Sequence, residues 1–154
     1  MLSKEKQMAN LGIPQNTIAV LQKYDFNFQK RFGQNFLIDT NVLDRIISSA
    51  EITKDDCVLE IGPGIGTMTQ YLAESAREVV AVEIDKNLIP ILGDTLSAYD
   101  NVTIINDDIL KVDVQGLIKE KLDGGPVKLV ANLPYYITTP IVMKFLEENI
   151  PVTD

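Results

Sequence analysis

Short runs of β-branched residues alternate with longer stretches in which apolar residues recur at helical spacing. The short runs predict four strands, at residues 57–61, 78–83, 102–106 and 127–131. The longer stretches predict helices at about residues 14–24, 40–50, 67–75, 86–97, 114–121 and 140–149. Because strands that alternate with helices at this spacing form right-handed βαβ units, we predict an α/β fold around a parallel sheet.

Local signals mark where two of these helices begin. Thr67 and Gln70 fit a capping box, and Thr139 followed by Pro140 is typical of a helix start. Ligands of open parallel sheets bind beyond the carboxyl ends of the strands. The residues that follow each predicted strand are therefore the first candidates for function.

The composition limits the chemistry that is possible. The 154 residues are 45% hydrophobic and 23% charged, which is typical of one globular domain. The absence of histidine excludes a Ser/His/Asp triad and a His-ligated metal site, and the single cysteine excludes an internal disulfide. No apolar run approaches the roughly 20 residues of a membrane span, and there is no signal-peptide pattern. We therefore expect a cytoplasmic protein with neither a metal nor a membrane partner.

Charge is distributed unevenly along the chain. The net charge is −8, yet residues 1–31 carry five basic and two acidic residues. We therefore predict a basic, helical N-terminal extension over residues 1–31 and a separate domain over residues 32–154. The extension either contacts phosphate groups or is a solvated surface, and the sequence leaves both interpretations open.

Three glycines follow the first predicted strand. Gly62, Gly64 and Gly66 let the backbone turn sharply and approach a ligand closely, although a tight turn without a ligand is the simpler alternative. The dinucleotide-binding pattern requires its third glycine at position 67, where this chain has Thr67. The loop therefore fits S-adenosylmethionine better than the pyrophosphate of a nicotinamide cofactor.

Acidic residues follow the second and third predicted strands. Glu83 lies 21 residues after Gly62, which is the spacing of a carboxylate that accepts both ribose hydroxyls, whereas Asp85 fits a solvated acid at a helix start. One of Asp107 and Asp108 suits a hydrogen bond from an adenine amine and the other suits helix capping, and the sequence does not choose between them. These acidic surroundings favour a cationic sulfonium over a pyrophosphate.

The fourth predicted strand is followed by Asn132-Leu133-Pro134-Tyr135. The amino group of adenine or cytosine is a poor nucleophile because its lone pair is delocalised into the ring. The Asn132 side-chain oxygen and the Leu133 carbonyl, oriented by Pro134, can accept its two N–H bonds and direct the lone pair at an electrophilic methyl group. Tyr135 can stack on an extruded base. This chemistry needs no histidine; a proline turn with buried tyrosines is the alternative.

Several motifs occur together over residues 28–148: F-G-Q-N-F-L at 32–37, E-I-G-P-G-I-G at 60–66, Glu83, Asp108 and N-L-P-Y at 132–135. In this combination they resemble the ribosomal RNA adenine N6-dimethyltransferases, a family that includes small-subunit dimethylases and erythromycin-resistance methylases. The resemblance implies a Rossmann-like class I methyltransferase that uses S-adenosylmethionine, with sheet order 3-2-1-4.

The resemblance also implies which residues bind the cofactor. Asn35 and Leu37 would close over its methionine end, and the loop of three glycines would line it. Glu83 would bind the ribose, and Asp108, together with the backbone of Ile109, would bind the cofactor adenine.

For the last motif the resemblance implies catalysis. Asn132 and the Leu133 carbonyl would hold the target amine beside the cofactor, with Pro134 shaping the turn and Tyr135 against the base. The family transfers two methyl groups to each target adenine, and its small-subunit branch modifies two adjacent adenines in a 3′-terminal hairpin of the ribosomal RNA. The residues before Phe32 and the motif that begins at Asn132 are more similar to that branch, so the small ribosomal subunit is the expected partner.

Three alternatives remain at this point. The first is a large-subunit methylase of the erythromycin-resistance type, and the second is a module that binds cofactor or RNA without catalysis. The third is a nicotinamide oxidoreductase, which Thr67 and the lack of an evident acid for hydride transfer disfavour.

Members of the family are nearly twice as long, with further strands and a helical RNA-binding domain. We therefore expect the chain to be a fragment whose own activity is open. Its fourth strand would have an unpaired edge beside Leu129 and Val130, which predicts self-association, strand exchange or marginal stability.

Overall fold

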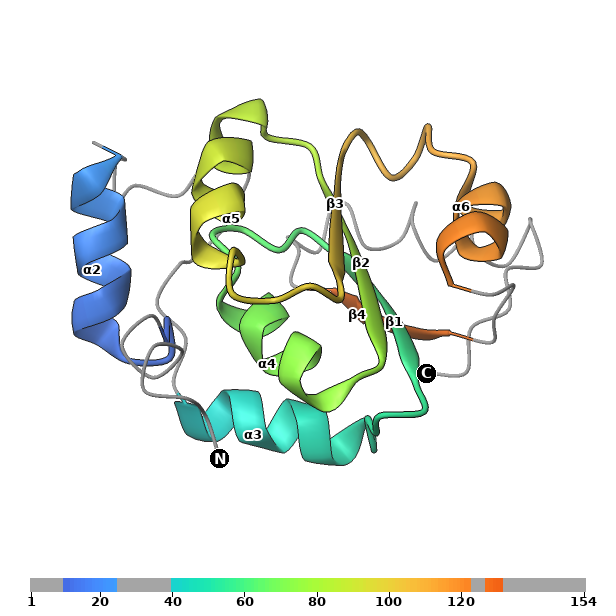
Figure 1. Ribbon diagram of the computed structural model, residues 1–154, viewed down its shortest axis with the longest axis horizontal. Coiled ribbons are helices and arrows are strands. Elements are labelled where there is room, and N and C mark those ends of the chain that lie inside the picture. The colour runs from blue at the N-terminus through green and yellow to red at the C-terminus, as the bar shows by residue number, and fades with distance from the viewer. Residues whose placement is uncertain (1–9, 25–39, 123–126, 132–154) are drawn as a thin grey trace.

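Four parallel strands form the centre of the fold (Figure 1). The computed structural model describes residues 10–24, 40–122 and 127–131. The strands are β1 (Cys57–Ile61), β2 (Glu78–Glu83), β3 (Val102–Asn106) and β4 (Lys128–Ala131). The helices are α2 (Pro14–Lys23), α3 (Thr40–Ser49), α4 (Thr67–Ser75), η1 (Lys86–Leu88), α5 (Ile89–Thr95) and α6 (Val114–Lys121). The strand order β3-β2-β1-β4, with every pair parallel, confirms the predicted sheet.

Most predicted element boundaries agree with the structure. Three predicted strands coincide with β1, β2 and β3, and β4 begins one residue later than predicted. The helix predicted over residues 86–97 is instead a 3-10 turn, η1, followed by α5. Pro90 explains the break, because a residue without an N–H fits only the first turn of an α-helix. The helix predicted at residues 140–149 lies outside the described residues, as does its start at Thr139-Pro140.

Helices cover both faces of the sheet (Figure 1). Leu59 of β1 is buried in a cluster with Ile118 of α6, whereas its neighbour Val58 is buried with Leu72 of α4 on the other face. This alternation follows from the two-residue period of a strand. Because both faces are covered, the central strands are almost continuously apolar, which is why their sequence pattern is easily recognised.

The predicted capping box at Thr67 and Gln70 is wrong. Gly66 is the N-cap of α4, with φ of 99°, and no side chain caps the helix. Thr67 is already the first helical residue, and its buried Oγ1 has no hydrogen-bond partner within the described structure. The Gln70 side chain is bonded to other elements, to Leu11 N and to Thr95 O. Because Gly66 in its left-handed conformation is the N-cap, Thr67 lies inside the helix and cannot cap it. The Gln70 side chain is hydrogen-bonded to residues outside the helix.

Residues 10–24 pack against the rest of the fold. Leu11 and Leu21 are buried in one cluster with Leu92 of α5. At the end of α2, Lys23 Nζ lies 2.5 Å from Asp94 Oδ2. The described part of the predicted N-terminal extension is thus joined to the domain by a shared core. The predicted domain boundary at residue 31 lies outside the described residues and stays a prediction.

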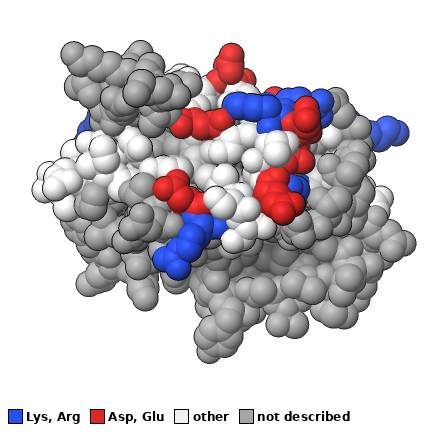
Figure 2. Space-filling view, turned by 90° about the horizontal axis from the view of Figure 1, so that it is seen from below, with Lys and Arg blue, Asp and Glu red and all other residues white. Residues whose placement is uncertain are grey.

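The surface around α3 carries charges of both signs. In the view from below Figure 1, acidic and basic side chains lie beside one another (Figure 2). The exposed charged residues of α3 and of the turn after it include Asp44, Arg45, Lys54 and Asp55. The described residues of this surface therefore form no patch of a single sign.

Among the described strands, β4 lies at one edge of the sheet and pairs with β1. Its residues Leu129 and Val130 are half-buried, unlike the fully buried Leu59 and Glu60 opposite them. None of the described helices has both the length and the apolar character that a bilayer crossing requires.

Candidate functional site

The parallel register brings the loops after the strands together at one edge of the sheet, the one formed by the carboxyl ends of the strands. Ile61, the last residue of β1, pairs with Val82 and with Ala131, and Glu83 pairs with Asn106. The glycine loop, Glu83 and the acidic residues after β3 therefore lie at the same edge, as the sequence predicts. Six predicted site residues lie outside the described residues, so their roles stay predictions. They are Asn35 and Leu37 of the N-terminal motif and Asn132, Leu133, Pro134 and Tyr135 after the fourth strand.

The glycine loop follows β1 and depends on its glycines for its backbone conformation. Gly62, Gly64 and Gly66 have φ values of 74°, 64° and 99°, in the left-handed region that other residues rarely adopt. Gly62 N donates to Val82 O at 3.0 Å, which fastens the loop to β2. A Cβ atom on Gly66 would lie 3.0 Å from Thr95 Oγ1. The three glycines are thus required by the turn and by close packing against α5.

Glu83 is the centre of the hydrogen bonds at this edge. Its side chain is fully buried, and Oε1 accepts a bond from Gly64 N at 3.1 Å while Oε2 accepts one from Asp85 N at 2.9 Å. Its main-chain oxygen accepts bonds from Asp107 N at 3.1 Å and from Asn106 Nδ2 at 2.8 Å. One residue therefore joins the loops that follow β1, β2 and β3.

Asp85 differs from its prediction in one respect. It does start a helical turn, because its Oδ1 accepts a bond from Asn87 N at 2.9 Å. However, the residue is only 4% exposed, so it is not a solvated acid. Its Oδ2 is buried with no hydrogen-bond partner in the part of the chain that the structure describes. Its main-chain N–H donates to Glu83, the last residue of β2.

Glu60 is a third buried carboxyl group beside this site. It lies inside β1, is 1% exposed, and accepts a 2.5 Å hydrogen bond from Thr69 Oγ1 of α4. Burial raises the pKa of Glu60 to about 8; the bond from Thr69 opposes this rise, and the charge of Glu83 adds to it. Glu60 is therefore protonated at neutral pH. The sequence analysis assigned it no role, although an acid inside an apolar strand was a signal.

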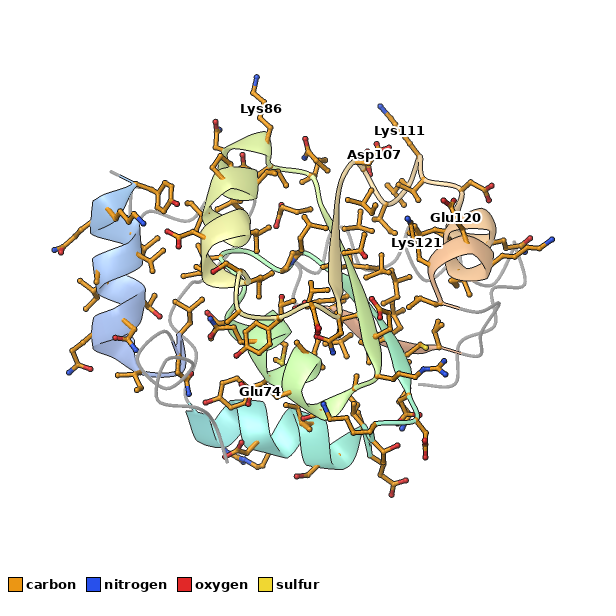
Figure 3. All side chains as sticks on the ribbon, viewed as in Figure 1. Glu74, Lys86, Asp107, Lys111, Glu120 and Lys121 are labelled. Atoms are coloured by element: carbon orange, nitrogen blue, oxygen red, sulfur yellow. The ribbon has the colours of Figure 1, made fainter. Side chains whose placement is uncertain are left out.

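The acidic residues after β3 both serve the turn that they begin. Asp107 Oδ1 accepts a bond from Asp108 N at 2.7 Å, and Asp108 Oδ1 accepts one from Leu110 N at 3.0 Å. Neither residue caps a helix, because a turn follows them and the N-cap of α6 is Asp113; the contact of Asp108 with a cofactor adenine stays a prediction. Ile109 is buried in the core cluster beneath α6. Figure 3 shows Asp107, Lys111 and Lys86 at the same end of the molecule.

Two exposed apolar side chains at this edge were missed by the sequence analysis. Ile84 follows β2 and is 51% exposed, and Leu110 follows β3 and is 41% exposed. An apolar residue between two acids, as in Glu83-Ile84-Asp85, was the available signal. Such side chains beside buried carboxylates are suited to contact a flat apolar group of a ligand.

Comparison with known proteins gives a family. A family model described as ribosomal RNA adenine dimethylase matches residues 25–154. The ribosomal RNA small subunit methyltransferase A of Lachnoclostridium phytofermentans is 73% identical over 146 residues, covering 94% of this chain and 50% of that protein. Its counterpart from Clostridioides difficile is 64% identical over 147 residues, covering 96% of this chain and 51% of that protein. The chain spans about half the length of these curated relatives.

Solved structures agree with the predicted methyltransferase fold. The 23S rRNA methyltransferase ErmE superposes with a TM-score of 0.63 and 36% identity, over 77% of this chain and 45% of that one. A dimethyladenosine transferase from Plasmodium falciparum superposes with a TM-score of 0.59 and 28% identity, over 71% and 37%. An RNA methyltransferase from Salinibacter ruber, solved with S-adenosyl-L-homocysteine, shares the fold at 17% identity and a TM-score of 0.61, over 75% of this chain and 71% of that one.

Proposed function

The chain belongs to the ribosomal RNA adenine dimethylase family, and we propose that it is the cofactor-binding part of an enzyme that methylates N6 of adenines in small-subunit ribosomal RNA. The cofactor is S-adenosylmethionine, which supplies a methyl group made electrophilic by its sulfonium. The observation that carries this proposal is the direct bond from Gly64 N to the buried Glu83 carboxylate, because it unites the predicted loop and the predicted ribose acceptor.

The residues present fit this cofactor. The glycine loop lacks side chains where a ligand must approach the backbone, and Glu83 supplies the acceptor for a pair of ribose hydroxyls. Ile84, next to Glu83 and half exposed, suits one face of the adenine ring. Burial keeps Glu60 neutral, and the oxygens of Glu83, which already accept two backbone N–H bonds, are the acceptors for hydroxyl donors in this proposal.

The transfer step rests on residues that the structure does not describe. We propose that the Asn132 side-chain oxygen and the Leu133 carbonyl accept the two N–H bonds of the target amine, that Pro134 orients that carbonyl and that Tyr135 stacks on the base. The product ammonium is acidic enough to release its proton to water, so no imidazole is needed. Asn35 and Leu37 cover the methionine end in the same proposal.

The small-subunit substrate is favoured over the large-subunit one. The curated relatives with 73% and 64% identity bear the small-subunit name, whereas the 23S rRNA methyltransferase ErmE is 36% identical. We propose two methyl groups on each of two adjacent adenines in a 3′-terminal hairpin, within ribosome assembly in the cytoplasm. Ribosomal RNA is then the partner, and the edge of β4 is the proposed surface for self-association.

Calorimetry and methyl transfer test this proposal in sequence. We expect heat of binding with S-adenosylmethionine and none with NAD; binding of NAD alone would support the oxidoreductase alternative. Methyl transfer is then measured on small subunits and on large subunits that lack the modification, with the Lachnoclostridium relative as positive control. Transfer to large subunits would contradict the small-subunit proposal, and cofactor binding without transfer would mean that this chain binds the cofactor without catalysis of its own.

A further inference from the structure

A chain of three buried hydrogen bonds links the N-terminal segment to the glycine loop. Leu11 N donates to Gln70 Oε1 of α4 at 2.8 Å. Gln70 Nε2 donates to Thr95 O of α5 at 2.9 Å, and Thr95 Oγ1 donates to Ile65 O of the loop at 2.7 Å. All three bonds are buried, so water does not replace them easily. The Gln70 side chain is the bridge, since it accepts from one element and donates to another.

Apolar packing follows the same route. Leu11 and Leu21 share a buried cluster with Ile65, the residue at the centre of the glycine loop. Thr17 Oγ1 donates to Leu11 O at 2.8 Å, which holds the segment before α2 against the helix itself. At the far end of α2, the Tyr24 hydroxyl donates to Asp94 of α5 at 2.9 Å. The segment 10–24 is therefore fastened along its length to the elements that surround the loop.

The glycine loop is held between two opposite supports. From β2, Glu83 accepts the bond from Gly64 N; from α5, Thr95 donates to the carbonyl of the next residue, Ile65. Space on the α5 side is small, because a Cβ on Gly66 would lie 3.0 Å from Thr95 Oγ1. A shift of Thr95 must therefore move the loop, and with it the Gly64 N–H that meets Glu83.

We propose that Gln70 and Thr95 are positioning residues through which segment 10–24 holds the glycine loop in its cofactor-binding conformation. The inference rests on the proposed function, because it assumes that this loop binds S-adenosylmethionine. Docking of the segment and binding of the cofactor are then linked, and linkage is reciprocal: each favours the other by the same factor. The N-terminal segment thus belongs to the cofactor site although none of these bonds touches the ligand.

The variant Thr95→Val tests the loop end of this chain, since it removes the hydroxyl donor and retains the shape of the side chain. We expect the Kd for S-adenosylmethionine, measured by calorimetry, to rise about tenfold, as for the loss of one buried hydrogen bond. Thr95→Ser keeps the hydroxyl and should restore affinity. Ile118→Val, in the cluster on the other face of the sheet, is the control for lost stability, and its Kd should stay within about twofold.

Hydrogen exchange of the unmodified chain tests the N-terminal end independently of any variant. Because Leu11 N donates to Gln70, S-adenosylmethionine should slow exchange at the Leu11 amide. Unchanged exchange there in a chain that binds the cofactor would overturn this inference and leave the proposed function standing. The same holds if Thr95→Val binds as tightly as Ile118→Val. Failure of the unmodified chain to bind S-adenosylmethionine would overturn both.

Discussion

Replacing Glu83 with glutamine changes one atom of the candidate site and removes its charge. In the wild-type chain each carboxylate oxygen accepts one backbone N–H, from Gly64 at 3.1 Å and from Asp85 at 2.9 Å. A glutamine offers a single carbonyl oxygen, so in either orientation its NH₂ group faces one of these N–H donors. A buried donor without an acceptor costs about 1–3 kcal/mol. We expect urea denaturation to show a loss of that size in the free energy of unfolding.

The same change should weaken cofactor binding. Hydrogen bonds from ribose hydroxyls to a carboxylate are charge-assisted, and their loss is worth about 1–3 kcal/mol, or about 5- to 150-fold in the Kd for S-adenosylmethionine. Calorimetry measures this directly. Unchanged affinity of Glu83→Gln would refute the ribose role, whatever happens to stability.

A matched control separates binding from stability. Glu74 Oε1 accepts a bond from the Tyr99 hydroxyl at 2.7 Å, and Figure 3 shows Glu74 at the end of the molecule away from Lys86 and Asp107. Glu74→Gln should therefore leave the Kd unchanged. If it weakens cofactor binding as much as Glu83→Gln does, the effect at Glu83 is a loss of stability and our reasoning fails.

Three further predictions follow from the buried polar groups and the proposed mechanism. The pKa of Glu60 is about 8 in the folded chain against an ordinary 4.5, so between these values the folded state holds a proton that the unfolded chain releases, and the free energy of unfolding falls as pH rises. Glu60→Gln should flatten this slope in urea denaturation from pH 5 to pH 8. An unchanged slope would contradict the raised pKa of Glu60. The mostly buried Lys128 Nζ lies 2.6 Å from Ala50 O, 2.8 Å from Glu51 O and 3.3 Å from Asp56 Oδ2. Lys128→Met should therefore lower the free energy of unfolding, measured by urea denaturation, by about 2–4 kcal/mol. The control Lys121→Met, at an exposed lysine, should change it by less than about 0.5 kcal/mol. In a full-length relative, the residue that matches Asn132, replaced by alanine, should slow methyl transfer and leave the Kd for S-adenosylmethionine nearly unchanged; equal loss of both would assign Asn132 a structural role.

The strands were predictable because their burial is simple. A strand covered on both faces is almost continuously apolar, so β1 (CVLEI) and β2 (EVVAVE) stand out in the sequence as short runs rich in aliphatic residues, although β1 also contains the buried Glu60. The parallel arrangement alone predicts that the loops after the strands meet, and the bond from Gly64 N to Glu83 confirms that the glycine loop and Glu83 lie together.

Three of the wrong or missing predictions concern polar side chains whose surroundings are set by the packed structure. The Gln70 side chain suits a local cap, yet it is bonded to Leu11 and Thr95, which lie 59 and 25 residues away. Asp85 fits a solvated acid, yet the residue is only 4% exposed. The pKa of Glu60 depends on burial between β1 and α4, which spacing along one chain does not reveal.

The order of the strands has a consequence for synthesis of the protein. Strands β1, β2 and β3 are added side by side in the order in which the chain is translated, so this part of the sheet can assemble once residue 106 has left the ribosome. The partner of β1 on its other side, β4, begins only at Lys128. The glycine loop and Glu83 therefore precede the N-L-P-Y segment in translation, and under the proposed function the part that binds the methyl donor is made before the part that holds the substrate.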